Sequence, residues 1–388
     1  MIRISLSSAP DSTVFFSIHQ SPEKLSRIVF TVVNDLTYDQ RMRRISRSLA
    51  EAGYEVLLIG RKLKSSVPLS NEIFRQHRLT LLFRKGKLFY LEYNLRLFFY
   101  LLFQKFDVAG GIDLDTILPC YFISKLKGKK CVYDAHELFT EVPEVIRRPF
   151  TQSIWRWVEK YAIHRIKNCY TVSEGLANYF QQRYACKFEV VRNVPLLEES
   201  FSNGRSDKRE RFIFYQGALN EGRGLEHLIT AIQSVPMKLK LAGEGDLSVQ
   251  LRNLVEESRL TEKVEFLGRK LPDELKYFTR ESFIGVNLLE NKGLSYYYSL
   301  ANKFFDYVHA GIPVITMNFP EYVHLNQQYN VAVLVNDLQT DTLVNAITQL
   351  SDNKDAYFRL QENCFRARHE WNWQKEEQKL ISFYQSLK

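Results

Sequence analysis

The sequence has little cysteine, and its cysteines are not spaced for chemistry. They are odd in number, widely scattered, and form no C-x-x-C pair. Closely paired cysteines are typical of zinc and redox sites, and dense disulfides are typical of small secreted domains. We therefore expect reduced thiols in a cytoplasmic protein at all five positions, Cys120, Cys131, Cys169, Cys186 and Cys364.

The chain also lacks a long, uninterrupted apolar run. Its first 25 residues contain no apolar core of the kind that a signal peptide needs, and residues 1–24 are expected to form an N-terminal extension. The most apolar stretch, residues 88–103, is interrupted by Glu92, Asn94 and Arg96. A membrane-spanning helix needs about 20 nearly uninterrupted apolar residues, so this segment is not expected to span.

Neither low complexity nor a short internal repeat is present, which argues against disorder and solenoid folds. Hydrophobic residues make up 45% of the chain and charged residues 25%, as in ordinary globular proteins. The length of 388 residues predicts two or three domains at about 150 residues each.

The net charge of +9 is concentrated in one stretch. Residues 61–106 contain ten Lys or Arg against two Glu, and they include the apolar run. One interpretation is a helix that lies on an anionic membrane surface, with its aromatic side chains in the interface. The other is a core-facing helix whose charges are merely solvated. The sequence alone leaves both open.

Strand and helix patterns alternate through both halves of the chain, which is typical of α/β domains with parallel sheets. Residues 25–195 form the first unit, and a polar linker leads into a second at residues 196–368. Residues 369–388 read as a final helix that crosses back to the first unit. We predict two doubly wound, Rossmann-like domains that face a central cleft.

Two segments of the second unit carry candidate ligand-binding residues. A glycine loop follows its first strand, with Gly217, Gly222 and Gly224 around Arg223. A later helix is expected to start at Ser299 as its N-cap, and Asn302, Lys303 and Asp306 then lie near its first turn. A lysine there opposes the helix dipole unless an anion compensates both. A diphosphate held by arginine, lysine and backbone amides fits this pattern.

In order and spacing, these segments resemble the retaining, GT4-type (group 1) glycosyltransferases of bacteria, which have the GT-B fold. The resemblance covers the glycine turn, a G-x-G loop at residues 242–246, a strand ending at Gly268, and the helix at 299–314. It implies that the first domain is the acceptor side and the second binds a nucleotide-sugar donor. It implies no metal and no other cofactor.

The resemblance also assigns roles to particular residues. Asp306 is expected to bind the donor ribose, and Arg223 and Lys303 the diphosphate. Gly268 and Arg269 are expected near the nucleobase, and the family's histidine beside the transferred sugar corresponds to His136. We accordingly predict a catalytic set of His136, Arg223, Lys303 and Asp306; donor-binding residues Gly217, Gly222, Gly224, Glu244, Gly268, Arg269, Ser299 and Asn302; and acceptor-side residues Asp39, Arg41, Asp134 and Glu137.

The sequence departs from the family pattern at three places. The first of the family's two acids falls on Tyr298, and its usual arginine after the first glycine falls on Ala218. The N-terminal loop at residues 34–41 is not rich in glycine. These changes bear on the identity of the donor and on the local geometry of its site.

The function implied is a metal-independent, retaining hexosyltransferase that transfers a sugar to a cell-surface glycan or lipid-linked acceptor at the cytoplasmic membrane face. Residues 61–106 would meet the anionic surface, and no nucleic-acid partner is expected. Two alternatives remain at this point. One is a nucleotide-sugar epimerase of similar fold, and the other a non-enzymatic, basic adaptor for membrane or nucleic acid.

Overall fold

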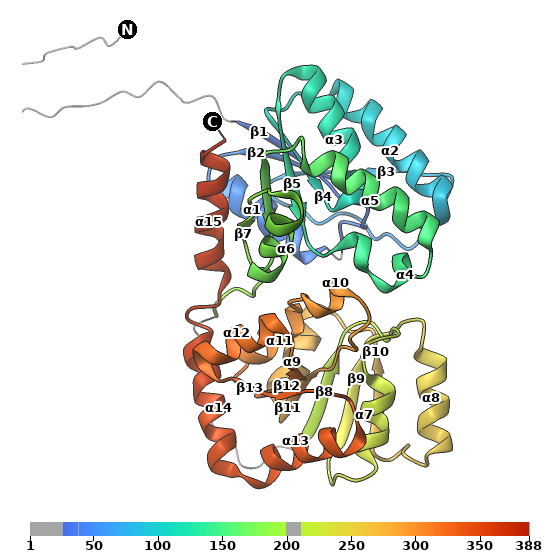
Figure 1. Cartoon of the computed structure of the whole chain (residues 1–388), viewed down its shortest axis with the longest axis vertical. Helices are drawn as coiled ribbons and strands as arrows, with labels where there is room; N and C mark the ends of the chain where they lie inside the picture. The colour runs from blue at the N-terminus through green and yellow to red at the C-terminus, as the bar shows by residue number, and fades with distance from the viewer. Residues whose placement is uncertain (1–25, 38, 199–210, 388) are drawn as a thin grey trace, which may run out of the picture.

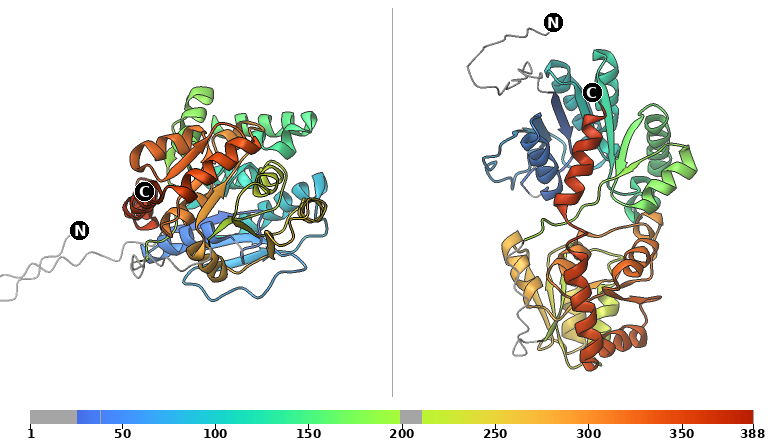
Figure 2. Two further views of the ribbon diagram at one scale, coloured as in Figure 1. Left: turned by 90° about the horizontal axis from the view of Figure 1, so that it is seen from below. Right: turned by 90° about the vertical axis from the view of Figure 1, so that its left-hand side faces the viewer.

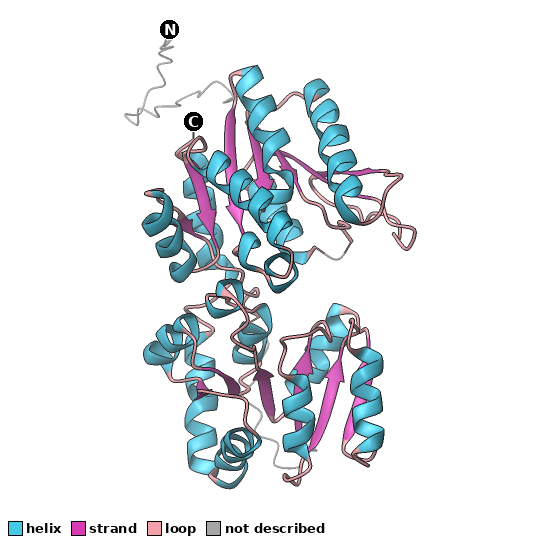
Figure 3. Ribbon diagram, turned by 45° about the vertical axis from the view of Figure 1, so that its right-hand side comes forward, coloured by secondary structure: helices cyan, strands magenta, loops and turns pink. Residues whose placement is uncertain are grey.

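A computed structural model describes residues 26–37, 39–198 and 211–387 (Figure 1). The expected N-terminal extension at 1–24 and most of the polar linker lie outside the described residues. The described chain forms two α/β domains, one above the other in Figure 3, each built around its own parallel sheet.

The N-terminal domain contains a parallel sheet with the strand order β3-β2-β1-β4-β5-β6-β7. Local sequence explains how the first strand leads into the first helix. The buried strand β1 is followed by Asp39, whose side chain accepts a hydrogen bond from the Met42 N–H and caps helix α1. The elements are β1 (Arg27–Thr31), α1 (Gln40–Glu51), β2 (Glu55–Arg61), β3 (Arg75–Leu79), α2 (Gly86–Phe103), β4 (Val108–Ile112), α3 (Leu114–Lys127), β5 (Lys130–Ala135), the 3₁₀ turn η1 (Phe139–Glu141), α4 (Pro143–Ile146), α5 (Pro149–Ile163), β6 (Asn168–Thr171), α6 (Glu174–Tyr184) and β7 (Glu189–Val190).

The second domain contains a parallel sheet with the order β10-β9-β8-β11-β12-β13. One continuous hydrophobic cluster fills the space between this sheet and its helices. The elements are β8 (Phe212–Gln216), α7 (Leu225–Ile232), β9 (Lys238–Ala242), α8 (Ser248–Glu257), β10 (Val264–Gly268), α9 (Pro272–Glu281), β11 (Ile284–Asn287), α10 (Leu294–Tyr297), α11 (Asn302–His309), β12 (Val314–Met317), α12 (Pro320–Tyr329), β13 (Ala332–Val335), α13 (Thr340–Asp352) and α14 (Lys354–Ala367).

The last helix, α15 (Trp373–Gln385), lies on the N-terminal domain rather than on the domain that precedes it (Figure 2). Its buried residues Trp373, Leu380 and Tyr384 join the cluster that covers one face of the N-terminal sheet. The rings of Tyr384 and Phe30 meet edge to face, with 5.8 Å between their centres. The chain therefore crosses between the domains twice.

Helix α2, which contains the apolar run, buries one stripe of side chains and exposes others. One stripe, Phe89, Tyr93, Leu97 and Leu101, is buried in the cluster that it shares with α3 and α5. The opposite face stays exposed and is also apolar, because Leu88, Leu91, Leu95, Phe99 and Phe103 are each more than half exposed. None of the described helices is long and apolar enough to cross a bilayer.

Candidate active site

The two domains enclose a hollow of about 850 Å³ at the carboxyl ends of their strands. Residues from α1 and the β5 loop line one wall, and residues from β8, α9 and α11 line the other. Ligands in open α/β sheets bind at this edge, so the geometry marks the hollow as the candidate site.

The donor-side wall is built on glycines that let three strand ends touch. The Gly217 N–H donates to the Ala242 carbonyl at 2.9 Å, and the Gly243 N–H donates to the Gly268 carbonyl at 2.8 Å. A Cβ on Gly243 would lie 1.8 Å from the Gly217 oxygen, and Gly217, Gly243 and Gly268 all have positive φ. Only glycine fits such a close approach without strain.

Helix α11 brings three charged or polar side chains to this wall. It begins at Asn302 with Ala301 as its N-cap, so the expectation that Ser299 caps it is wrong. The Ser299 hydroxyl instead donates to the Tyr296 carbonyl at 2.8 Å, at the end of the short helix α10. Asn302, Lys303 and Asp306 line the hollow, whereas Ser299 does not.

Lys303 and Arg223 are the uncompensated cations of this wall. The Lys303 ammonium lies 3.8 Å from the centre of the Tyr215 ring, and the Arg223 guanidinium lies 5.1 Å from the centre of the Tyr296 ring. Within the described residues, neither side chain has an ion pair, and Nε of Arg223 is buried without a hydrogen-bond partner. Burial, followed by repulsion from Arg223, lowers the pKa of Lys303 well below its usual value.

Asp306 lies one helical turn beyond Lys303. Its Oδ2 accepts a hydrogen bond from the Gln216 amide at 2.7 Å. Burial raises its pKa to about 6, although Arg44, Lys276 and Lys303 favour the charged form. Asp306 is therefore a carboxylate above about pH 6, able to accept hydrogen bonds from ligand hydroxyls.

The opposite wall holds a closed network of paired charges. Arg41, only 6% exposed, donates to both carboxylate oxygens of the fully buried Asp134, at 2.9 and 3.2 Å. Nε of Arg41 also lies 2.7 Å from Nε2 of His136. Burial alone would raise the pKa of Asp134, but the charges of Arg41 and then His136 outweigh it and hold that pKa below its usual value.

His136 is held from both sides of its ring. Its Nε2 lies 3.1 Å from Asp134 Oδ2, and its Nδ1 lies 3.6 Å from Asp113 Oδ2. Asp113 also accepts a hydrogen bond from the His136 backbone N–H at 2.8 Å. Burial would lower the pKa of His136, but Asp134 and Asp113 raise it overall. The ring is thus fixed in place.

Two further acids lie on this wall. Asp39 caps α1, and its second oxygen accepts from the Asn34 amide at 3.1 Å, so both of its oxygens are occupied. Glu137 lines the hollow, and its side chain is exposed. Desolvation, with repulsion from Asp113, raises its pKa to about 7.

The structure does not bring every expected donor-binding residue to the hollow. Gly222 and Gly224 shape the turn before α7: a Cβ would lie 2.7 Å from the Tyr296 ring at the first position and 2.6 Å from the Leu288 carbonyl at the second. Glu244 is paired with Arg252 at 3.0 Å. The residues that do not line the hollow are Gly222, Gly224, Glu244, Gly268, Arg269, Ser299 and Asp134.

Other residues at the site were not found from the sequence. They include Gln216, which holds Asp306; Tyr215, whose ring faces Lys303; and Arg44, from the second turn of α1. Tyr215 and Gln216 end the first strand of the donor domain, which is the one local signal that could have identified them. No local pattern distinguishes Arg44 from the other arginines of α1.

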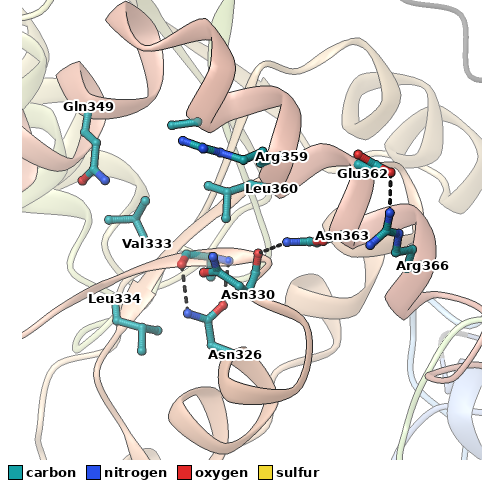
Figure 4. Close-up of a pocket in the computed structure, with 12 residues that line it drawn as sticks. Asn326, Asn330, Val333, Leu334, Gln349, Arg359, Leu360, Glu362, Asn363 and Arg366 are labelled. Carbon is teal, nitrogen blue, oxygen red and sulfur yellow. Dashed lines mark hydrogen bonds and ion pairs between the residues drawn. The ribbon is translucent and has the colours of Figure 1, made fainter.

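A second hollow of about 750 Å³ lies on the donor domain, bounded by α12, β13, α13 and α14 (Figure 4). Its polar groups largely satisfy one another. The Asn363 amide donates to the Asn330 carbonyl at 3.2 Å, and the Arg366 guanidinium is paired with Glu362 at 2.6 Å. None of the expected site residues lies there.

Two protein-family models match consecutive parts of this chain. Residues 40–195 match the model for glycosyltransferase family 4, and residues 198–367 match that for glycosyl transferases group 1. Together they span the N-terminal domain from α1 onward, without β1, and the donor domain with its glycine loops and α11. A comparison with curated proteins finds no match.

Solved structures share the fold at low sequence identity. The sucrose-phosphate synthase of Thermosynechococcus elongatus is 17% identical, with a TM-score of 0.79 over 93% of this chain and 99% of that one. HepE of Anabaena in complex with UDP-glucose is 13% identical, with a TM-score of 0.73 over 93% and 99%. A putative UDP-N-acetylglucosamine 2-epimerase from Listeria monocytogenes is 11% identical, with a TM-score of 0.62 over 94% and 96%.

Because an epimerase shares the architecture, the fold by itself does not distinguish the two enzymatic alternatives. The family models do, since both halves match glycosyltransferases. The chain therefore belongs to the group 1, GT4-type glycosyltransferases and has their GT-B fold.

Proposed function

We propose that the protein transfers a hexose, with retention of configuration and without a bound metal, from a nucleoside diphosphate sugar to a glycan or lipid-linked acceptor. The observation that carries the donor class is the pair of uncompensated cations, Lys303 and Arg223, beside the start of α11. The first N–H groups of a helix have no partner within the helix and favour an anion. Because HepE was solved with UDP-glucose, UDP sugars are the first candidates.

In this proposal, the donor's diphosphate binds between Lys303, Arg223 and the first amides of α11, and Asp306 accepts hydrogen bonds from the ribose. The bond from the sugar's anomeric carbon to the phosphate oxygen breaks, and a bond to the acceptor oxygen forms. The acceptor's proton leaves with the nucleoside diphosphate. Lys303 and Arg223 stabilise the charge that grows on the leaving group, which is commonly the largest catalytic contribution.

On the other wall, we propose that His136 contacts the transferred sugar. Arg41, Asp134 and Asp113 fix its ring, so little reorganisation is needed when substrate binds. Enclosure of the substrate between the two domains excludes water, which otherwise competes with the acceptor.

The donor assignment is tested by thermal stabilisation with UDP, GDP, ADP and CMP. A ligand at 100 times its Kd stabilises a protein by about 2.7 kcal/mol. We expect one nucleotide to raise the Tm, the rise to disappear in Asp306→Ala, and the rise to persist in Asp341→Ala, an exposed acid on α13. No rise with any nucleotide would refute the proposal. Retention is checked by the anomeric NMR signal of the product, and metal independence by activity in EDTA.

We further propose that the acceptor-side domain lies on an anionic membrane surface at the cytoplasmic face. The exposed apolar face of α2 is extended by Phe122 and Leu126 of α3 and by Phe150 and Trp157 of α5, all more than 40% exposed. These helices cover one side of the domain (Figure 1). The basic residues Arg84, Lys85 and Lys87 lie at the start of α2, where they can meet lipid phosphates.

Sedimentation with vesicles of anionic and of neutral lipid tests this surface. We expect binding to anionic vesicles only, and loss of binding in Leu91→Glu with Phe99→Glu. Val249→Glu is the matched control, because Val249 is 71% exposed on the donor domain. Equal binding by all variants would exclude this face as the membrane contact.

A further inference from the structure

Helix α1 carries four arginines, and only one of them lacks a carboxylate. Arg41 is paired with Asp134, while Arg43 and Arg47 are both paired with Glu72, at 2.5 and 2.7 Å. Arg44 makes no ion pair with any described residue. Its Nη2 donates to the Asn193 side-chain oxygen at 2.6 Å, its guanidinium lies 5.2 Å from the centre of the Trp373 ring, and its Nε is buried without a partner.

A desolvated guanidinium without a counter-ion is unfavourable. Burial, with repulsion from Arg41, lowers the pKa of Arg44 to about 10, and only Asp306 across the cleft opposes that shift. Because Arg44 lines the interdomain hollow, an anion that enters the hollow would remove this penalty. An anion in the hollow would likewise compensate the unpaired charges of Lys303 and Arg223 on the facing wall.

A short hydrogen-bonded chain connects Arg44 to the donor wall. Asn193, which accepts from Arg44, donates through its amide to the Asn302 side-chain oxygen at 2.7 Å. Asn302 is the first residue of α11 and precedes Lys303. Arg44 therefore reaches from the N-terminal domain toward the start of the helix where the donor's diphosphate is proposed to bind.

The acids on Arg44's own wall argue against an anionic acceptor as its partner. Asp39 and Glu137 line the same hollow, and both would repel a second anion held on that side. On the facing wall, Lys303 in the first turn of α11 and Arg223 both line the hollow, and Asp306 lies one helical turn further along α11. The charges around the hollow therefore favour the donor's diphosphate, and not an anionic acceptor, as the partner of Arg44.

We propose that Arg44 is a donor-binding residue, contributed by the N-terminal domain, that contacts the diphosphate from the side opposite Lys303. This inference rests on the proposed function, since it assumes a nucleoside diphosphate sugar as donor. The preceding loop, residues 34–41, has no glycine that would let its backbone approach a phosphate. In this proposal, an arginine side chain of α1 makes the phosphate contact instead. Donor bound in this way contacts both domains.

The test is calorimetric titration with UDP and with uridine, alongside GDP and ADP with their nucleosides. Arg44→Gln keeps a donor for Asn193 but removes the charge, and Arg44→Lys keeps the charge. We expect Arg44→Gln to weaken UDP about tenfold, which equals about 1.4 kcal/mol, while uridine binding is unchanged. Arg44→Lys should recover most of the lost affinity. Arg47→Gln, on the outer face of the same helix, should bind UDP like the unmodified protein.

The alternative outcomes are distinct. Equal UDP affinity in Arg44→Gln and the unmodified protein would overturn the assignment of Arg44 and leave the proposed function intact. A parallel loss of UDP and uridine binding, unrelieved by lysine, would show that Arg44 only packs against Trp373 and Asn193, and would also overturn it. If the unmodified protein binds none of the diphosphates, the proposed function itself fails.

Discussion

On the N-terminal wall of the cleft, Arg41 has Asp134 as its counter-ion and His136 is held between Asp134 and Asp113, whereas on the donor wall Lys303 and Arg223 form no ion pair with any residue that the structure describes. Arg41 and Asp134 are buried, whereas Lys303 and Arg223 are half-buried, so the paired charges are also the less exposed ones. Paired charges fix side chains before substrate arrives, while unpaired charges gain most from a charged ligand. The contrast thus separates residues that provide geometry from residues that provide binding energy.

The largest expected effect is loss of stability on the paired wall. Asp134→Asn leaves the buried Arg41 without a counter-ion, and breaking a buried pair in this way costs about 3–5 kcal/mol. Urea unfolding monitored by circular dichroism measures the change. Glu362→Gln is the control, because its pair with Arg366 is about two-thirds exposed, and such pairs contribute about 0.3–0.5 kcal/mol. Similar losses in both variants would contradict the comparison.

On the unpaired wall, removal of a cation should impair catalysis more than stability. Lys303→Ala is expected to reduce kcat/KM about 100- to 1,000-fold, because a cation that stabilises the leaving diphosphate is lost. Its free energy of unfolding should stay the same or rise, since an uncompensated buried charge is removed.

Lys276→Ala is the matched control for this prediction. Lys276 lines the same hollow but is already paired with Glu198 at 2.5 Å. Steady-state kinetics of sugar transfer, with the donor whose nucleotide stabilises the protein in the thermal test, give kcat/KM for both variants. A comparable fall in kcat/KM for the two variants would mean that the hollow needs positive charge in general rather than an unpaired lysine.

The smallest effect concerns pH. Because burial raises the pKa of Asp306 to about 6, its carboxylate form is lost as pH falls through that value. We expect UDP-glucose affinity to fall up to about tenfold between pH 7 and pH 5, and this dependence to vanish in Asp306→Asn. UDP-glucose is preferred to UDP because its phosphates do not titrate in this range.

The other titrating groups of the cleft act in the opposite direction. As pH falls, His136 gains a proton and Glu137 loses its charge, so both changes make the cleft more positive and favour a diphosphate. Calorimetric measurement of UDP-glucose affinity at several pH values distinguishes the effect of Asp306 from that of His136 and Glu137. Tighter binding at pH 5 would show that the N-terminal wall, and not Asp306, dominates the pH response.

Strands and the donor wall could be predicted from the sequence where the local residue pattern matches the local structure. Apolar, β-branched runs in the sequence coincide with β1, β2 and most strands of the donor domain, and glycines stand at the strand ends of the donor wall. Strand β4 has no such run, because it contains Gly110 and Gly111, which are unfavourable in strands on propensity alone. Both are required here, since a Cβ would lie 2.7 Å from Phe30 at one and 2.7 Å from Ile117 at the other.

Three other features differ from what local sequence patterns indicate, each for its own reason. Strand β3 reads RQHRL and has no apolar alternation, because it is an edge strand with only one neighbour. Ser299 looked like an N-cap, but the chain turns once more through Leu300 and Ala301 before α11 begins. Arg44 contacts Asn193, which lies 149 positions away, so no local pattern could indicate their hydrogen bond.

The two passages of the chain between the domains lie against each other, because the Trp373 backbone N–H donates to the Pro195 carbonyl at 2.8 Å. A single connection would let one domain twist and slide relative to the other. Two connections joined at one point leave mainly a rotation about that point, as in a hinge. Arg44, whose guanidinium lies 5.2 Å from the centre of the Trp373 ring, is close to this point, where a small rotation would displace it little. The far rim of the cleft would move most, so such a rotation would admit substrates and release products while the groups near the axis keep their spacing.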